Sequence, residues 1–268
     1  MDLTTVTEVL VARDRADLAD PRPGDAFLAG GTALYGEPHD TLRRLVDLSE
    51  LDWEPLTVRP DGLHIAATCT VAELRALQPP VEWPHLSRLV ADCCDAFLAS
   101  FKIWNRSTVG GNLCVSYPAG SMISLTAAAD GRVLVWRPDG TEYVLPVTDF
   151  VVGDTVNVLR PGEVLREIVL PGAALRATYA MRKLALAPLG RSSAVIIGRT
   201  DGADVVLTVS ATTTRPFTLR VPRGPVPDLV ARLDAVVAGH WVDDVYGAAP
   251  WRRHITAVLA HEVLEELA

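Results

Sequence analysis

Apolar and polar positions change rhythm several times along the 268-residue chain, which predicts a mixture of strands and helices. The first thirty residues are expected to form a short helix and a Pro/Gly turn, followed by a brief apolar strand over residues 26–28. This strand leads directly into Ala29-Gly30-Gly31-Thr32. Two further apolar runs predict strands over residues 44–48 and 63–69.

The strongest helical pattern lies between Pro84 and Lys102, where apolar residues recur at spacings of three and four and share one face. Before it, Thr70 and Glu73 have the spacing of a capping box, which predicts the start of another helix. After the long helical pattern the chain reaches Thr108-Val109-Gly110-Gly111-Asn112, which is expected to be a second glycine-rich loop.

The second half of the chain mixes strands and helices without strict alternation, so the expected fold class is α+β. The pattern changes near Pro171 and Gly172, and we place a domain boundary near residue 175. The elements predicted in this half are a small-residue helix over 125–129, a hairpin around 137–140, a strand ending at 171, strands over 204–212 and 217–221, a helix over 229–237 closed by Gly239, and a final amphipathic helix over 255–267.

The charge balance and the cysteines exclude several classes of function. A formal net charge of −8 argues against a nucleic-acid-binding surface, which needs concentrated positive charge. No run approaches the roughly 20 apolar residues of a membrane span, and the N-terminus lacks the pattern of a signal peptide, so we expect a soluble cytoplasmic protein. Cys69, Cys93, Cys94 and Cys114 form no C-x-x-C pair, so no zinc or iron–sulfur site is expected on this chain.

The two glycine segments carry the candidate chemistry. Gly30 and Gly31 permit a positive φ and let backbone amides approach an anion, and the hydroxyl of Thr32 adds a donor. The second segment offers two hydroxyls, two glycines and the side-chain amide of Asn112. Each segment alone is a weak signal, but together they predict a diphosphate held from two sides. Neither matches a P-loop or the G-x-G-x-x-G of a Rossmann site, so we expect a dinucleotide in a different fold.

Three stretches, Phe27–Leu34, Leu45–Ser49 and Asn105–Leu113, resemble the FAD-binding (medium) subunit of molybdenum hydroxylases. This is the flavoprotein family of xanthine dehydrogenase and carbon monoxide dehydrogenase. Because the similar stretches occur in the family's order along almost the whole chain, the resemblance is more specific than either glycine segment alone. The later similar stretches are Pro146–Phe150, Leu159–Leu165 and Asp244–Arg253.

The resemblance implies an FAD-binding PCMH-type fold and FAD as the cofactor. Residues 1–175 would form the PCMH-type domain, with α/β subdomains over about 1–55 and 56–175. Residues 176–268 would form a smaller C-terminal flavoprotein domain with an antiparallel sheet and helices.

The resemblance also assigns roles to single residues. Leu165 would pack against the isoalloxazine ring. Ser121 stands where the family usually has an Asp that hydrogen-bonds the cofactor. Ser carries no charge, so the affinity for FAD and the reduction potential of the flavin can differ from those of the relatives. No catalytic acid or base is expected, because the flavin carries the redox chemistry. The residues implied around the FAD pyrophosphate and adjoining sugar are Leu28, Ala29, Gly30, Gly31, Thr32, Ala33 and Leu34 from the first segment, and Thr108, Gly110, Gly111 and Asn112 from the second.

Two partners follow from the resemblance, a small subunit with a [2Fe–2S] centre and a large subunit with molybdopterin. The chain would take electrons from the [2Fe–2S] partner to FAD and on to NAD or another acceptor. A stand-alone PCMH-type flavin oxidoreductase is an alternative, but it needs its own acid and substrate pocket, which the sequence does not reveal. A flavin-free interaction module is a second alternative, supported by Ser121 alone.

Overall fold

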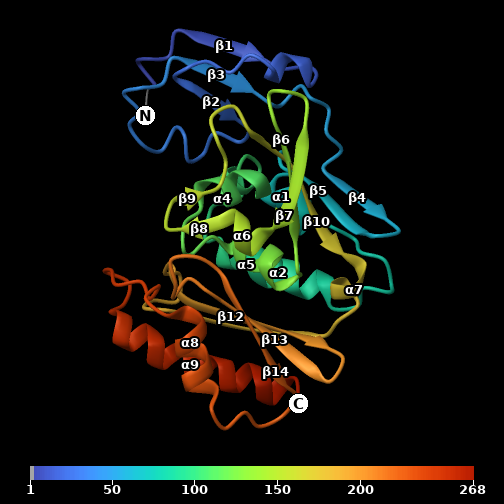
Figure 1. The fold of residues 1–268 in the computed structure, drawn as a ribbon, viewed down its shortest axis with the longest axis vertical. Coiled ribbons are helices and arrows are strands. Elements are labelled where there is room, and N and C mark those ends of the chain that lie inside the picture. Colours follow the sequence, from blue (N-terminus) through green and yellow to red (C-terminus); the bar gives the residue numbers. More distant parts are fainter. Residues whose placement is uncertain (1–2) are drawn as a thin grey trace.

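Three larger sheets follow one another along the long axis of the molecule, with the longer helices in the central and C-terminal parts (Figure 1). The structure is a computed structural model that describes residues 3–268. Its mixture of separate sheets and helices confirms the predicted α+β class.

The N-terminal sheet is parallel and has the order β1-β3-β2, formed by Glu8–Val11, Arg44–Asp47 and Asp25–Leu28. The prediction of a helix in the first thirty residues is wrong. Strand β1 pairs with β3 along its whole length, and among residues 3–30 only one 3-10 turn, Ala16–Leu18, is helical. The local pattern misses this strand because its pairing partner lies beyond β2 in the sequence, and sheet formation depends on such neighbours.

The central sheet is antiparallel and has the order β4-β5-β10-β6-β7. Helices α1, α2, α4, α5 and α6 pack with its strands around the main hydrophobic cluster. The strands are β4 (Leu56–Arg59), β5 (Gly62–Ala66), β6 (Arg132–Trp136), β7 (Glu142–Pro146) and β10 (Val164–Pro171), with a small sheet of β8 (Val151–Gly153) and β9 (Val156–Asn157). The helices are α1 (Val71–Arg75), α2 (Leu86–Ala96), α3 (Phe101–Trp104), α4 (Val109–Val115), α5 (Ser121–Ala128), α6 (Val147–Phe150) and α7 (Gly172–Leu175).

Two of these helices test the sequence predictions closely. The capping box is confirmed, because Thr70 Oγ1 accepts from the amide of Glu73 and the Glu73 carboxylate accepts from the amide of Thr70. The helix predicted between Pro84 and Lys102 is confirmed over residues 86–96 as α2, but its continuation to Lys102 is wrong, because α2 ends at Ala96 and α3 is a separate turn. Leu98 between them has a φ of +46°, a left-handed conformation that does not continue a right-handed helix.

The C-terminal sheet is antiparallel and has helices on both faces (Figure 1). Helices α8 and α9 cover one face, and α2 and α5 of the central part contact the other. A Cβ at Gly198 on β12 would lie 2.4 Å from the side chain of Val263, so glycine lets α9 pack directly on this strand. The elements are β11 (Tyr179–Ala185), β12 (Ser192–Asp201), β13 (Asp204–Ser210), β14 (Phe217–Pro222), α8 (Leu229–Val237) and α9 (Ala249–Glu266).

The buried apolar residues form three clusters, one for each larger sheet. Cys69, Cys93 and Cys94 lie in the main cluster, as expected for small apolar side chains, and burial raises the pKa of their thiols. The N-terminal cluster is small and includes Val164 from β10 of the central sheet. The division into domains near residue 175 stays a prediction. Within residues 3–268, no helix is both long and apolar enough to cross a bilayer.

Candidate cofactor-binding site

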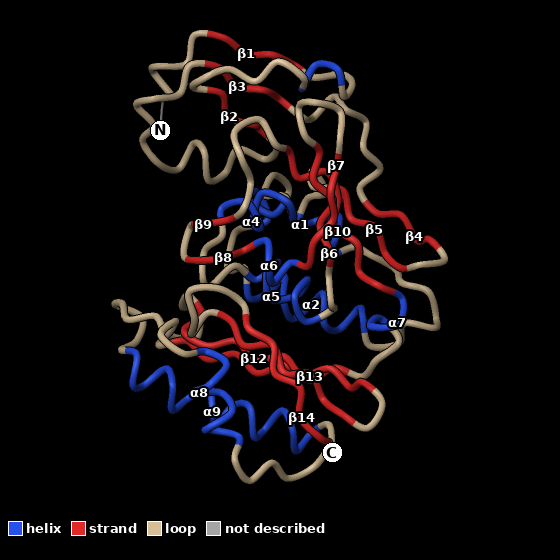
Figure 2. The backbone as a smooth tube through the Cα atoms, viewed as in Figure 1, coloured by secondary structure: helices blue, strands red, loops and turns tan. Residues whose placement is uncertain are grey.

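The fold brings the two glycine segments into contact. The hydroxyls of Thr32 and Ser107 lie 2.8 Å apart. Gly30 packs on the backbone before the second segment so closely that a Cβ would lie 1.7 Å from the carbonyl oxygen of Arg106. The first segment begins at the carboxyl end of β2 and continues as the long irregular connection to β3 (Figure 2). This end of a parallel sheet is where α/β folds commonly place their ligands.

The first segment presents backbone amides without acceptors. Gly31 has a φ of +74°, and a tight turn follows, closed by bonds of 2.8 Å from the amide of Tyr35 to Gly31 O and from the amide of Gly36 to Ala33 O. Within residues 3–268, the amides of residues 30–34 donate to no protein oxygen. Several unpaired amides at the start of a turn form an anion-binding concavity.

The second segment is helical, so the loop predicted there is wrong. Thr108 is the N-cap of α4, and its Oγ1 accepts from the amide of Gly111 at 3.0 Å. This is the preferred arrangement at a helix start. Gly110 therefore lies in the first helical turn and has no positive φ.

The amides at the start of α4 are already bonded within the protein. Val109 donates to the carbonyl of Cys69 at 2.8 Å, and Gly110 donates to the carbonyl of Ala67 at 3.0 Å. A Cβ at Gly110 would lie 2.5 Å from that of Ala67, so glycine here serves close packing of the helix on the end of β5. These backbone amides are therefore not free for a ligand.

Two side chains near this helix have hydrogen-bonding groups to spare. Asn112 Oδ1 accepts from the amide of Met122 at 3.2 Å, which joins α4 to the first turn of α5, while its Nδ2 donates to no described residue. Ser121 is 3% exposed, and its Oγ has no partner within residues 3–268. A buried hydroxyl without a partner is unfavourable, and a cofactor atom would satisfy it. The residues present thus fit a bound diphosphate with an adjoining polar group.

Leu165 lies in a different setting from the glycine segments. It is on β10 opposite Val135, beside a bulge, and only 3% of it is exposed. It belongs to the main hydrophobic cluster. Its predicted contact with the isoalloxazine ring stays a prediction.

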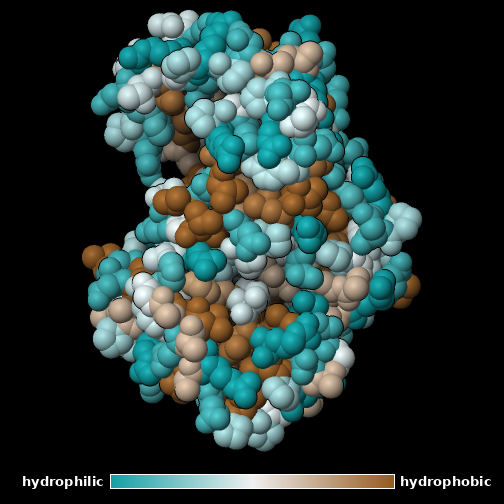
Figure 3. Space-filling model, viewed as in Figure 1, coloured by the Kyte–Doolittle hydropathy of each residue, from teal (hydrophilic) through white to brown (hydrophobic). Residues whose placement is uncertain are grey.

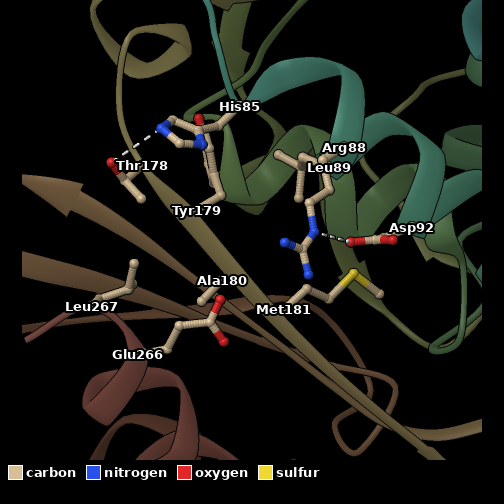
Figure 4. Close-up of a pocket in the computed structure, with 10 residues that line it drawn as sticks. All are labelled: His85, Arg88, Leu89, Asp92, Thr178, Tyr179, Ala180, Met181, Glu266 and Leu267. Atoms are coloured by element: carbon tan, nitrogen blue, oxygen red, sulfur yellow. Dashed lines mark hydrogen bonds and ion pairs between the residues drawn. The ribbon is translucent and has the colours of Figure 1, made fainter.

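Two cavities elsewhere in the molecule do not involve the glycine segments. One of about 160 Å³ lies between α2, β11 and the end of α9, where His85, Arg88 and Glu266 line it (Figure 4). This volume is below the several hundred Å³ typical of cofactor pockets. Another of about 450 Å³ lies between α5, α7 and the C-terminal sheet. Figure 3 instead shows a hollow between the N-terminal part and the central part.

Sequence reasoning missed several residues of this site. The carbonyls of Ala67 and Cys69 bind the start of α4, and two successive small residues at the end of β5 were a signal for such close packing. Tyr117 donates to Glu37 Oε1 at 2.5 Å, across 80 residues of sequence. No local pattern indicates a contact of that kind.

Residues 5–173 match the family described as the FAD binding domain in molybdopterin dehydrogenase. The chain belongs to this family. Membership confirms the resemblance found in the sequence and makes FAD the cofactor of this FAD-binding chain.

Curated relatives align with part of the chain. The nicotinate dehydrogenase FAD-subunit of Eubacterium barkeri is 28% identical over 167 residues, which are 60% of this chain and 55% of the relative. The carbon monoxide dehydrogenase medium chain of Hydrogenophaga pseudoflava is 26% identical over 163 residues, covering 59% and 55%. The caffeine dehydrogenase subunit beta of Pseudomonas sp. (strain CBB1) is 27% identical over 200 residues, covering 69% and 64%. The chain thus spans little more than half the length of the first two.

Solved structures share the fold over nearly the whole chain. A chain of the reconstituted CO dehydrogenase from Oligotropha carboxidovorans superposes with a TM-score of 0.81 at 19% identity, covering 99% of this chain and 98% of that one. A chain of quinoline 2-oxidoreductase from Pseudomonas putida 86 gives 0.80 at 18% identity, with the same coverage. At these identities the likeness establishes the fold.

Proposed function

We propose that this chain is the FAD-binding electron-transfer subunit of a molybdenum hydroxylase. It takes electrons from a partner subunit with a [2Fe–2S] centre and passes them to NAD or another acceptor, while a molybdopterin subunit oxidises the substrate. The observation that carries the proposal is the contact of Thr32 with Ser107, which lies beside the start of α4 next to the amides of residues 30–34, for which residues 3–268 offer no acceptor.

In this proposal the chain supplies binding and orientation. Amides of residues 30–34 donate to the diphosphate oxygens, and Asn112 Nδ2 and the hydroxyl of Ser121 add bonds from the other side. FAD, when bound, supplies hydride and one-electron chemistry. Neither glycine segment contains an acid or a histidine, so their part in this proposal is to bind the diphosphate. Leu165 is assigned to the ring only by resemblance.

FAD binding is tested first with the apo-chain. Titration with FAD is expected to quench flavin fluorescence until one FAD is bound per chain. FAD that stays fully fluorescent at micromolar protein, with a correctly folded chain by circular dichroism, contradicts the cofactor assignment and favours a flavin-free module.

The electron-transfer role is tested in the complex. The chain is expected to co-purify with two subunits that carry iron and molybdenum in proportion to FAD. After partial reduction of the [2Fe–2S] centre under anaerobic conditions, the flavin absorption is expected to bleach. A flavin that stays oxidised beside a reduced [2Fe–2S] centre contradicts the role, and a chain that purifies alone and oxidises a substrate by itself favours a stand-alone oxidoreductase.

A further inference from the structure

The C-terminal stretch Asp244–Arg253 is held by a buried arginine. Arg252 is 1% exposed, and its guanidinium donates to the Asp244 carboxylate at 2.5 Å and to the Gly247 carbonyl at 2.8 Å. It also donates to the carbonyls of Ser193 at 2.5 Å and Ala211 at 2.8 Å. A buried charge with this many acceptors is well stabilised. Arg252 therefore fixes the turn over residues 244–247 against β12 and the residue that follows β13.

This turn carries Tyr246 to an exposed arginine. The hydroxyl of Ser193 donates to the Tyr246 carbonyl at 2.7 Å, which adds to the hold of Arg252. The guanidinium carbon of Arg191, just before β12, lies 5.1 Å from the Tyr246 ring centroid and 5.8 Å from that of Tyr117. Both distances are within the range of about 6 Å for cation–π attraction.

Tyr117 connects this cluster to the first glycine segment. It follows α4, and the next residue, Pro118, accepts a bond of 2.9 Å from the amide of Ala211 in the C-terminal part. The hydroxyl of Tyr117 donates to Glu37, which follows the turn closed by the Gly36 amide on Ala33 O. A row of four side chains thus runs from the C-terminal sheet, past the end of α4, to the loop that presents the free amides.

We propose that Glu37, Tyr117, Arg191 and Tyr246 form a clasp that holds the first glycine segment against α4 and so slows the release of bound FAD. The inference rests on the proposed function in taking FAD as the occupant. The N-terminal sheet has only a small cluster of its own, which is anchored through Val164 and Trp136 of the central sheet. The clasp secures the loop that leaves this sheet. Tyr117 and Arg191 are thus positioning residues.

The clasp is tested by the rate at which FAD leaves the holo-chain, followed as the rise in flavin fluorescence after dilution. Y117F removes the donor and keeps the ring, and it is expected to speed release about three- to tenfold, as for the loss of one hydrogen bond. R191M keeps the bulk without the charge and is expected to act in the same direction. E37Q keeps an acceptor and is expected to stay near wild type.

The matched control is Y143F, because Tyr143 makes a similar bond of 2.8 Å to Glu163 on the central sheet. It is expected to leave release unchanged. A second readout needs no FAD: amide hydrogen exchange over residues 29–37 of the apo-chain is expected to be faster in Y117F than in Y143F. Unchanged release and unchanged exchange in both Y117F and R191M overturn the clasp. A wild-type chain that binds no FAD overturns the proposed function, and the exchange comparison still decides the clasp.

Discussion

The two glycine segments of this FAD-binding chain are alike in composition and differ in the use of their backbones. After β2, Gly31 takes a positive φ, and the amides of residues 30–34 donate to no acceptor in the described part of the chain. At the start of α4, Gly110 has no positive φ and its amide is bonded to Ala67. One segment presents donors, and the other makes room for a helix to approach a strand. A glycine pair therefore indicates close approach, and only the structure tells whether a ligand or the protein itself approaches.

The largest effect is expected from G30A. A Cβ at Gly30 would lie 1.7 Å from the carbonyl oxygen of Arg106, which is backbone and cannot turn aside. The segments must then separate, so we expect FAD affinity to fall by at least about 30-fold, equivalent to about 2 kcal/mol. Fluorescence titration with FAD measures it. G36A, whose Cβ would lie 3.2 Å from its nearest neighbours, is the control and should bind nearly as wild type. Equal FAD affinities in the two variants would contradict the view that the first glycine segment serves ligand binding.

G110A is expected to act on stability more than on binding. The added methyl meets Ala67 at 2.5 Å and pushes α4 away from β5, which should lower the free energy of unfolding by about 1–3 kcal/mol. Urea denaturation measures the change. G153A is the control, since its Cβ would meet nothing nearer than 3.5 Å. If G110A instead weakens FAD binding as much as G30A at unchanged stability, the second segment is not structural.

The two threonines sharpen the same contrast on a smaller scale. T108V removes the cap bond to the Gly111 amide and should cost about 1 kcal/mol of unfolding free energy, which T108S should largely restore. T32V removes the contact with Ser107 and should raise the FAD dissociation constant a few-fold, with little change in stability. Thermal unfolding and FAD titration of both variants decide between these outcomes. A stability loss from T32V that matches that of T108V would contradict the distinction.

The smallest expected effect is a loss of stability of the N-terminal sheet at low pH. Arg44 on β3 bonds Asp25 on β2 with 2.6 Å between Nη2 and Oδ2, and this hydrogen bond holds the pKa of Asp25 below its ordinary value. A lowered pKa in the folded state means that the stabilisation is present at neutral pH and is lost as the pH falls below about 4. Urea unfolding between pH 3 and 7 should show this loss in wild type. D25N should be less stable at pH 7, and its free energy of unfolding should change less with pH than that of wild type. An equal pH dependence of unfolding in both proteins would contradict the assignment.

The sequence pattern predicted the elements that are marked by residues close to one another in the sequence. The capping box at Thr70 and the apolar faces of α2 and α9 were visible because neighbours three and four residues apart form them. Strand β1 was missed because β3 stabilises it from beyond β2. Helix α4 was missed because two glycines lower helix propensity, and packing on Ala67 overrides that preference.

The predictions for the cofactor site succeeded and failed for the same reason. Composition alone identified both glycine segments, because few residue types allow close backbone approach. The hydrogen-bonding partner of each amide could not be predicted, since Val109 and Gly110 donate to the carbonyls of Cys69 and Ala67, which directly follow β5 and lie some forty residues away in the sequence. The link from Glu37 to Tyr117 depends on the packing of separate sheets, which no short window of sequence contains.

The connection between β2 and β3 has a consequence for engineering. These strands are parallel neighbours, so the chain must travel back along the sheet before β3 can pair, and such crossovers need a dozen or more residues. Here residues 29–43 make that return without a helix and also present the free amides. Grafting a loop from another flavoprotein must therefore conserve its span as well as its glycines. A shorter graft would unpair β3, the middle strand on which both neighbours depend.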